Sequence, residues 1–264
     1  ELVDRVKHPD SCPDAVAPID CADGTARPGP NELRRLTDVQ VAHAIGDALG
    51  VSLDPGVFPT SVRSKDFRTF AVNNSVSGAD VESVLLAAEQ AAERADLASL
   101  QDCQPTETAD ACGRRWAGEL ARDLFRRPLD PEEEELAVTF YDAGLPPDAA
   151  ARMTVEMLLQ TPQFLYLSDT TLPGSDAYDD YAVAERIAFF LTDSPPDATL
   201  RAAAEAGQLR TQVQVQAQSQ RLLDDARAVG VVQRFHEDWL DLYLLDTATR
   251  DPELFPDFDA LKAD

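Results

Sequence analysis

Hydrophobic residues recur every three or four positions along most of this chain, which is the period of a helix buried on one side. The first such stretch begins after Thr37, a suitable N-cap, and ends at Gly50. Ser77 can cap a second stretch in the same way. The predicted inward face of this second helix comprises Val81, Val84, Leu85, Ala88, Ala92 and Ala95.

Proline, glycine and acidic residues separate the helices expected further along the chain. Pro128 ends one of them, because proline lacks an amide hydrogen and restricts the residue before it. Asp130 then caps the next helix, with Pro131 at its first position and glutamates in its first turn. The predicted helices span roughly 110–125, 131–144, 147–160, 178–192, 197–207, 211–225 and 227–245.

The remaining segments lack a strand pattern, and no repeat of about 20–50 residues is present. Residues 161–167 form a short apolar run that can be helical or extended, and a long irregular loop is expected over 51–76. The sequence therefore predicts an all-α fold, an irregular bundle of about eight or nine helices. We expect an extended, disulfide-pinned lead-in over 1–32. A helical region over 33–168 follows, and a second one over 169–264 packs on it.

The charge balance restricts the partners. Forty-eight acidic residues face 23 basic ones in 264 residues, a net charge of −25. Such a field repels phosphate backbones and anionic lipid, so we expect no binding to nucleic acid, and it attracts cations or a basic protein partner. Solubility in salty water is the alternative explanation of the acidity. No run of about 18 apolar residues is present, so we expect no membrane span.

The four cysteines form two similar local units, Cys12 with Cys21 and Cys103 with Cys112. Both pairs enclose residues rich in turn formers, so we predict two local disulfides and an oxidising compartment: the periplasm, the cell surface or the exterior. A zinc site is the alternative, although the spacing fits the usual cysteine knuckle poorly. No Cys-x-x-Cys-His motif occurs, so this chain is not expected to attach a c-type haem covalently.

Four segments in order resemble a family of bacterial domains of unknown function, abundant in planctomycetes and myxobacteria and often beside or fused to cytochrome c modules. The segments are Leu33–Thr37 running to Ala48–Val51, Cys112 with Phe125–Leu129, Leu158–Tyr166, and Tyr181–Leu191 continuing to Trp239–Leu240. The resemblance implies an exported helical protein that works near redox or polymer-degrading machinery, with a separate cytochrome as a candidate partner. It supplies no catalytic residue. Relatives usually continue past the equivalent of Phe258 into further helical modules.

Few residues offer chemistry of their own. His43 and Asp47 share a helix face, which suits a metal or an acid–base pair, and His236 precedes Trp239. A structural role is the alternative for both histidines. Trp116 and Trp239 are predicted core aromatics. No nucleophile elbow and no phosphate loop is present.

Two charged clusters are further candidates. Four acids near residue 175 provide oxygen ligands for a calcium ion without the EF-hand order: Asp169, Asp176, Asp179 and Asp180. Arg126 and Arg127 can contact an anion, or they can neutralise the end of their helix and pair with Asp130 or Glu132.

These observations favour an exported helical scaffold or subunit of a larger assembly that is linked to redox chemistry. The alternative is a component of a secreted oxidoreductase or polymer-degrading enzyme, and whether the chain is an enzyme stays open. An enzyme predicts His43 or His236 in a pocket with acids, whereas a scaffold predicts a broad interface.

Overall fold

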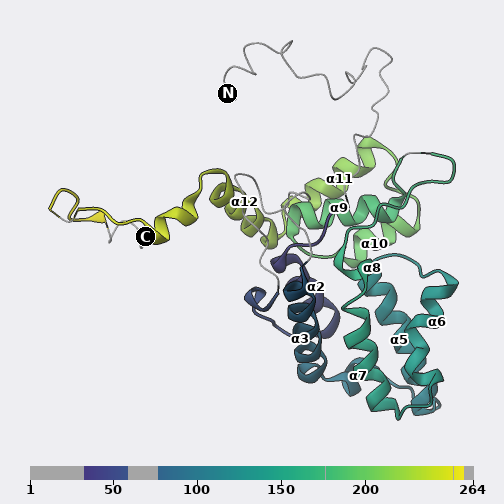
Figure 1. Cartoon of the computed structure of the whole chain (residues 1–264). Coiled ribbons are helices and arrows are strands. Elements are labelled where there is room, and N and C mark those ends of the chain that lie inside the picture. Colours follow the sequence, from purple (N-terminus) through teal and green to yellow (C-terminus); the bar gives the residue numbers. More distant parts are fainter. Residues whose placement is uncertain (1–32, 59–76, 176, 252, 259–264) are drawn as a thin grey trace. The chain divides into compact units, whose positions relative to one another are not determined.

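The computed structural model describes residues 33–58, 77–175, 177–251 and 253–258, all of which belong to one compact unit spanning Glu32–Asp264 (Figure 1). Within these residues the chain is helical, with two isolated bridges and no strand. The all-α prediction is confirmed. The lead-in over 1–32 and the Cys12–Cys21 pair lie outside the described residues.

The described residues form eleven α-helices, where the sequence predicted eight or nine. The two additional helices, α4 and α8, have four residues each and are too short to show a helical period. The α-helices are α2 (Asp38–Leu49), α3 (Gly78–Arg94), α4 (Leu97–Leu100), α5 (Ala109–Phe125), α6 (Pro131–Asp142), α7 (Pro147–Leu158), α8 (Pro162–Leu165), α9 (Asp180–Thr192), α10 (Ala198–Glu205), α11 (Gln212–Leu223) and α12 (Ala226–Trp239); the 3₁₀ helices are η2 (Pro55–Val57) and η4 (Leu242–Thr247).

The predicted N-caps Thr37, Ser77 and Asp130 are confirmed. Thr37 forms a reciprocal capping box with Gln40, Ser77 forms one with Asp80, and Asp130 forms one with Glu133. Gly50 ends α2 in the left-handed conformation. These local signals fix where each helix begins and ends.

The main core lies between α2, α3, α5, α6 and α7, with α5, α6 and α7 side by side (Figure 1). The predicted inward face of α3 is wrong in part, because Val81 and Leu85 are exposed. The buried face of α3 is instead made of alanines alone: Ala87, Ala88, Ala91 and Ala92. Small side chains let α3 approach α7 closely, and this outweighs the larger apolar area of valine and leucine.

A second hydrophobic cluster lies between α9, α10 and α11, and α12 packs on α9. The predicted helix over 227–245 is wrong at its end: α12 stops at Trp239, because Asp241 adopts a left-handed conformation that turns the chain into η4. Trp116 is buried as predicted, but Trp239 is 62% exposed and is not a core residue. The residue of α12 that is buried is Ala228. In the described part of the chain, no helix is long and apolar enough to cross a bilayer.

Candidate functional site

Two buried ionic joints hold the described helices together, and the first is at the end of α5. Arg126 is the C-cap of α5 and has a φ of 60°, a left-handed conformation that costs a non-glycine residue about 1–2 kcal/mol. Its side chain is only 2% exposed. An arginine at such a position indicates that the side chain is needed there.

All five N–H groups of the Arg126 guanidinium have an acceptor. Nε donates to Oε1 of Glu185 at 3.0 Å, and the two terminal nitrogens donate to four backbone carbonyls. These carbonyls belong to Leu124, Gln163, Phe164 and Tyr166. Glu185 is fully buried, and its other oxygen accepts the Ser168 amide at 2.7 Å. Arg126 therefore joins α5, α8 and α9.

Arg127 points to a different carboxylate. Its terminal nitrogens donate to both oxygens of Glu133 at 2.7 and 2.8 Å. Burial raises the pKa of the Glu133 carboxyl, but the hydrogen bonds from Arg127 and from the Asp130 amide outweigh it and hold this pKa below its usual value. The partners of the pair are thus Glu185 and Glu133, where the sequence suggested Asp130 or Glu132. Because every N–H group of the Arg126 guanidinium donates to an acceptor within the protein, the geometry favours a structural role for Arg126 and Arg127 over contact with an external anion.

The second joint is centred on Asp193, which ends α9 with a φ of 48°. One carboxylate oxygen accepts Nε2 of Gln40 at 2.8 Å, and the other accepts the Arg234 guanidinium. The Asp193 carbonyl oxygen lies 2.9 Å from Nδ1 of His43. Asp193 therefore connects α2, α9 and α12, and His43 has a structural contact.

The remaining candidate residues are separate from these joints. Nδ1 of His236 lies 2.7 Å from the Val232 carbonyl oxygen, and its exposed ring lies beside Phe235 and Trp239. Oδ2 of Asp47 lies 3.8 Å from Nη1 of Arg227. Two small pockets, one lined by Arg34, Phe189 and Val231 and one lined by Phe58, Val81 and Val84, include neither histidine.

The four acids proposed for calcium have varied surroundings. Asp179 caps α9 by accepting the Ala182 amide. Asp180 is buried and accepts the Leu209 amide and the Arg210 guanidinium, both within 2.9 Å. Asp169 is exposed, and Asp176 lies outside the described residues. Across the described ranges, no three His, Cys, Asp or Glu side chains gather in a way suited to a metal ion.

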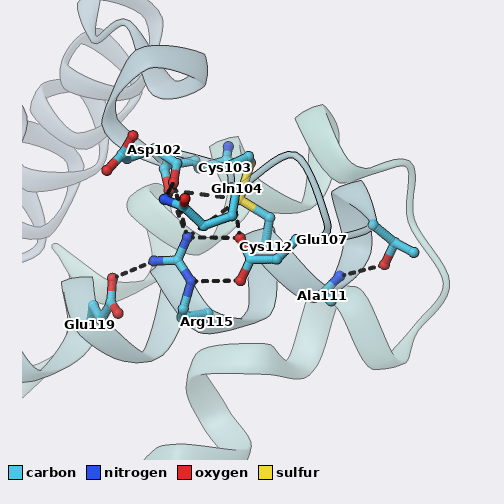
Figure 2. The surroundings of a disulfide bond; sticks show 10 residues. Asp102, Cys103, Gln104, Glu107, Ala111, Cys112, Arg115 and Glu119 are labelled. Atoms are coloured by element: carbon cyan, nitrogen blue, oxygen red, sulfur yellow. Dashed lines mark hydrogen bonds and ion pairs between the residues drawn. A yellow bond between two sulfur atoms is a disulfide. The ribbon is translucent and has the colours of Figure 1, made fainter.

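The predicted disulfide Cys103–Cys112 is present, with a Cα–Cα distance of 5.4 Å (Figure 2). Thr108 caps α5 just before Cys112, which is fully buried, whereas Cys103 lies in the exposed loop. Arg115 braces this loop: it pairs with Glu107 at 3.0 Å and with Glu119, and it donates to the carbonyls of residues 101 and 102. The hydrogen bond from Arg115 lowers the pKa of the Glu107 carboxyl.

We expect closure of this disulfide to raise the free energy of unfolding by about 2–3 kcal/mol, because the cross-link restricts the unfolded chain. The test compares oxidised and reduced protein in urea denaturation, in a Cys12→Ser/Cys21→Ser background so that only Cys103–Cys112 changes. The triple variant that adds Cys103→Ser controls for the reductant, which should leave its midpoint unchanged. Equal midpoints for oxidised and reduced protein would contradict the prediction.

An exposed apolar surface is the other notable feature. The α12 face, as we call it, comprises Val229, Val232, Phe235, Trp239 and Leu240, all exposed and all at helical spacing. The Trp239 ring lies 6.0 Å from the ring centroids of both Phe235 and His236. Exposed leucines of η4 follow directly: Leu242, Leu244 and Leu245. Exposed apolar side chains that gather in this way are typical of interaction surfaces.

Three family models match the chain in series. Residues 34–96 match PSD3, Protein of unknown function (DUF1587); residues 112–169 match PSD5, Protein of unknown function (DUF1595); and residues 178–264 match PSD4, Protein of unknown function (DUF1592). Over these three segments the chain is therefore similar to three families of domains of unknown function. No curated protein and no solved structure matches it.

The two ionic joints connect the three matched segments. Arg126 lies in the DUF1595 segment and Glu185 in the DUF1592 segment. Gln40 of the DUF1587 segment reaches Asp193 of the DUF1592 segment. Sequence reasoning missed both acids. Glu185 was detectable as the one carboxylate in the largely apolar run Tyr181–Leu191, whereas nothing local marks Asp193.

Proposed function

We propose that this chain is an exported subunit of a larger redox-linked assembly, and that its α12 face docks a separate, basic c-type cytochrome. The observation that carries the proposal is the exposed apolar surface of α12 and η4. The Cys103–Cys112 disulfide supports an oxidising location, and the resemblance to domains found beside cytochrome c modules supports the class of partner.

Charge decides between the possible occupants of the α12 face. Residues 224–258 contain nine Asp or Glu and three Arg, a net charge of −6, in a chain of net charge −25. Two copies of such a surface repel each other, whereas a basic partner is attracted over a long range. Electron-transfer partners typically use small interfaces of this type, in which charges steer and a central apolar patch makes the contact. The enzymatic alternative gains no support from His43 or His236, because both make structural contacts.

The test is a calorimetric titration of the chain with a purified single-haem c-type cytochrome of high isoelectric point. We expect Trp239→Ala to weaken binding about tenfold or more, since exposed tryptophans are the usual anchors of protein interfaces. Val213→Ala on α11 is the control, because Val213 is also strongly exposed, at 77%, but lies outside the α12 face. The affinity of this variant for the cytochrome should equal that of the wild type.

The dependence of affinity on ionic strength distinguishes a specific complex from general attraction between opposite charges. Raising the ionic strength should weaken the complex, but the difference between Trp239→Ala and Val213→Ala should persist. Absence of binding at low salt would reject the proposal. It would also be rejected if Trp239→Ala bound as tightly as wild type, because charge alone would then account for the complex.

A further inference from the structure

A small pocket lies where the start of α2, the end of α9 and the middle of α12 meet. It has a volume of about 110 Å³. Its walls are apolar on two sides, with Phe189 and Phe190 from α9 and Val231 from α12. Arg34, three residues before Thr37, the N-cap of α2, supplies a guanidinium to the lining.

Within the described residues, no carboxylate forms an ion pair with the guanidinium of Arg34. Among the residues that the structure describes, no acceptor lies within hydrogen-bonding distance of its buried Nε. Burial lowers the pKa of Arg34, and the charge of Asp193 offsets part of this effect. Both carboxylate oxygens of Asp193 are already bound, one to Gln40 and one to Arg234. A mostly buried cation without a bonded anion is costly, and such groups in native proteins call for a ligand or an ion.

The lining selects among anions. A planar guanidinium matches the two oxygens of a carboxylate. Asp38 and Asp238 also line the pocket, and their charge disfavours a doubly charged phosphate or sulfate more than a singly charged group. The aromatic walls favour an apolar body next to the carboxylate, and the volume restricts this body to about the size of a single ring.

We propose that this pocket binds a small organic monocarboxylate, with the carboxylate on Arg34 and the apolar body against Phe189 and Phe190. The pocket shares Phe235 with the α12 face. Its key residues, Arg34 and Phe190, are not part of that face, so binding of a small molecule here can be tested separately from cytochrome docking.

The test uses benzoate as the probe ligand. Its binding is monitored through the chemical shifts of isotope-labelled protein in a nuclear magnetic resonance titration. Benzamide, which has the same ring but no charge, and inorganic phosphate are the comparison ligands. We expect saturable shifts at residues 34–39 and 189–193 with benzoate, and affinities at least about tenfold weaker for both comparison ligands. Equal binding of benzamide would overturn the role of Arg34, and tighter binding of phosphate would overturn the monocarboxylate assignment.

Two substitutions test the roles of Arg34 and Phe190 in ligand binding. Arg34→Met should reduce the affinity for benzoate by about tenfold or more, whereas Arg94→Met, which removes the same charge from an exposed position on α3, should not change it. Phe190 is 69% exposed, so Phe190→Ala keeps the fold and should weaken benzoate several-fold. If Arg34→Met does not fold, the affinity of Phe190→Ala and the comparison of benzoate with benzamide still test the proposed site. Unchanged affinity in Phe190→Ala, or in folded Arg34→Met, would refute the site.

Discussion

Replacing Arg126 with methionine is expected to lower the free energy of unfolding by about 3–5 kcal/mol, because it leaves the Glu185 carboxylate buried without its counter-charge. Glu185 is fully buried, and its remaining hydrogen bond comes from the Ser168 amide. Four backbone carbonyls also lose their donors. Urea denaturation followed by far-ultraviolet circular dichroism measures the loss.

The neighbouring arginine provides the matched control. Arg127→Met removes the same charge at the next position, but Arg127 is 20% exposed, so its removal opens the Glu133 carboxylate to water. Glu133, itself 6% exposed, also keeps the hydrogen bond from the Asp130 amide. We expect a loss of about 1 kcal/mol there, the upper range for a partly exposed ion pair. A similar loss in both variants would show that burial does not determine how much the Arg126–Glu185 pair contributes to the free energy of unfolding.

A double variant separates the ion pair from the carbonyl contacts. Arg126→Met/Glu185→Leu removes both buried charges, so it should be more stable than the sum of the two single losses predicts. It should still be less stable than wild type, because the carbonyls and the Ser168 amide stay without partners. Strictly additive losses would contradict a direct interaction between the two side chains.

The contrast between Arg126 and Arg127 also shows what the sequence can reveal. Pro128, Asp130 and Pro131 act on their immediate neighbours, so the end of α5 and the start of α6 are predictable from them. The disulfide is predictable for the same reason, because nine positions separate its cysteines. Glu185 is 59 positions from Arg126, and although its apolar surroundings mark it in the sequence, no local rule pairs it with Arg126.

The faces of the helices are less predictable than their ends. In α3, hydrophobicity favours Val81 and Leu85 as core residues, but the close approach of α7 buries alanines instead. In α12, a tryptophan at helical spacing indicates a core position, yet Trp239 is exposed and Ala228 is buried. Periodicity identifies an apolar stripe, but only the neighbouring helices determine whether that stripe faces inward.

The second large effect is expected at Phe164, where replacement by alanine should lower the free energy of unfolding by about 3–5 kcal/mol. Phe164 is fully buried in the main core, although it belongs to the apolar run 161–167 whose conformation the sequence left open. This run forms the single turn α8 and then pairs Tyr166 with Arg35. Gln160→Ala is the control, since Gln160 is exposed and should change stability by less than about 0.5 kcal/mol.

Phe164 and Arg126 are coupled, because the Phe164 carbonyl accepts a hydrogen bond from the Arg126 guanidinium at 3.1 Å. The cavity left by Phe164→Ala allows α8 to shift, and this shift weakens the carbonyl contacts of Arg126. The double variant Arg126→Met/Phe164→Ala should therefore lose less stability than the sum of the two single losses, by about 0.5 kcal/mol or more. Additive losses would mean that the ionic joint and the core are independent, and that α8 holds its position without Arg126.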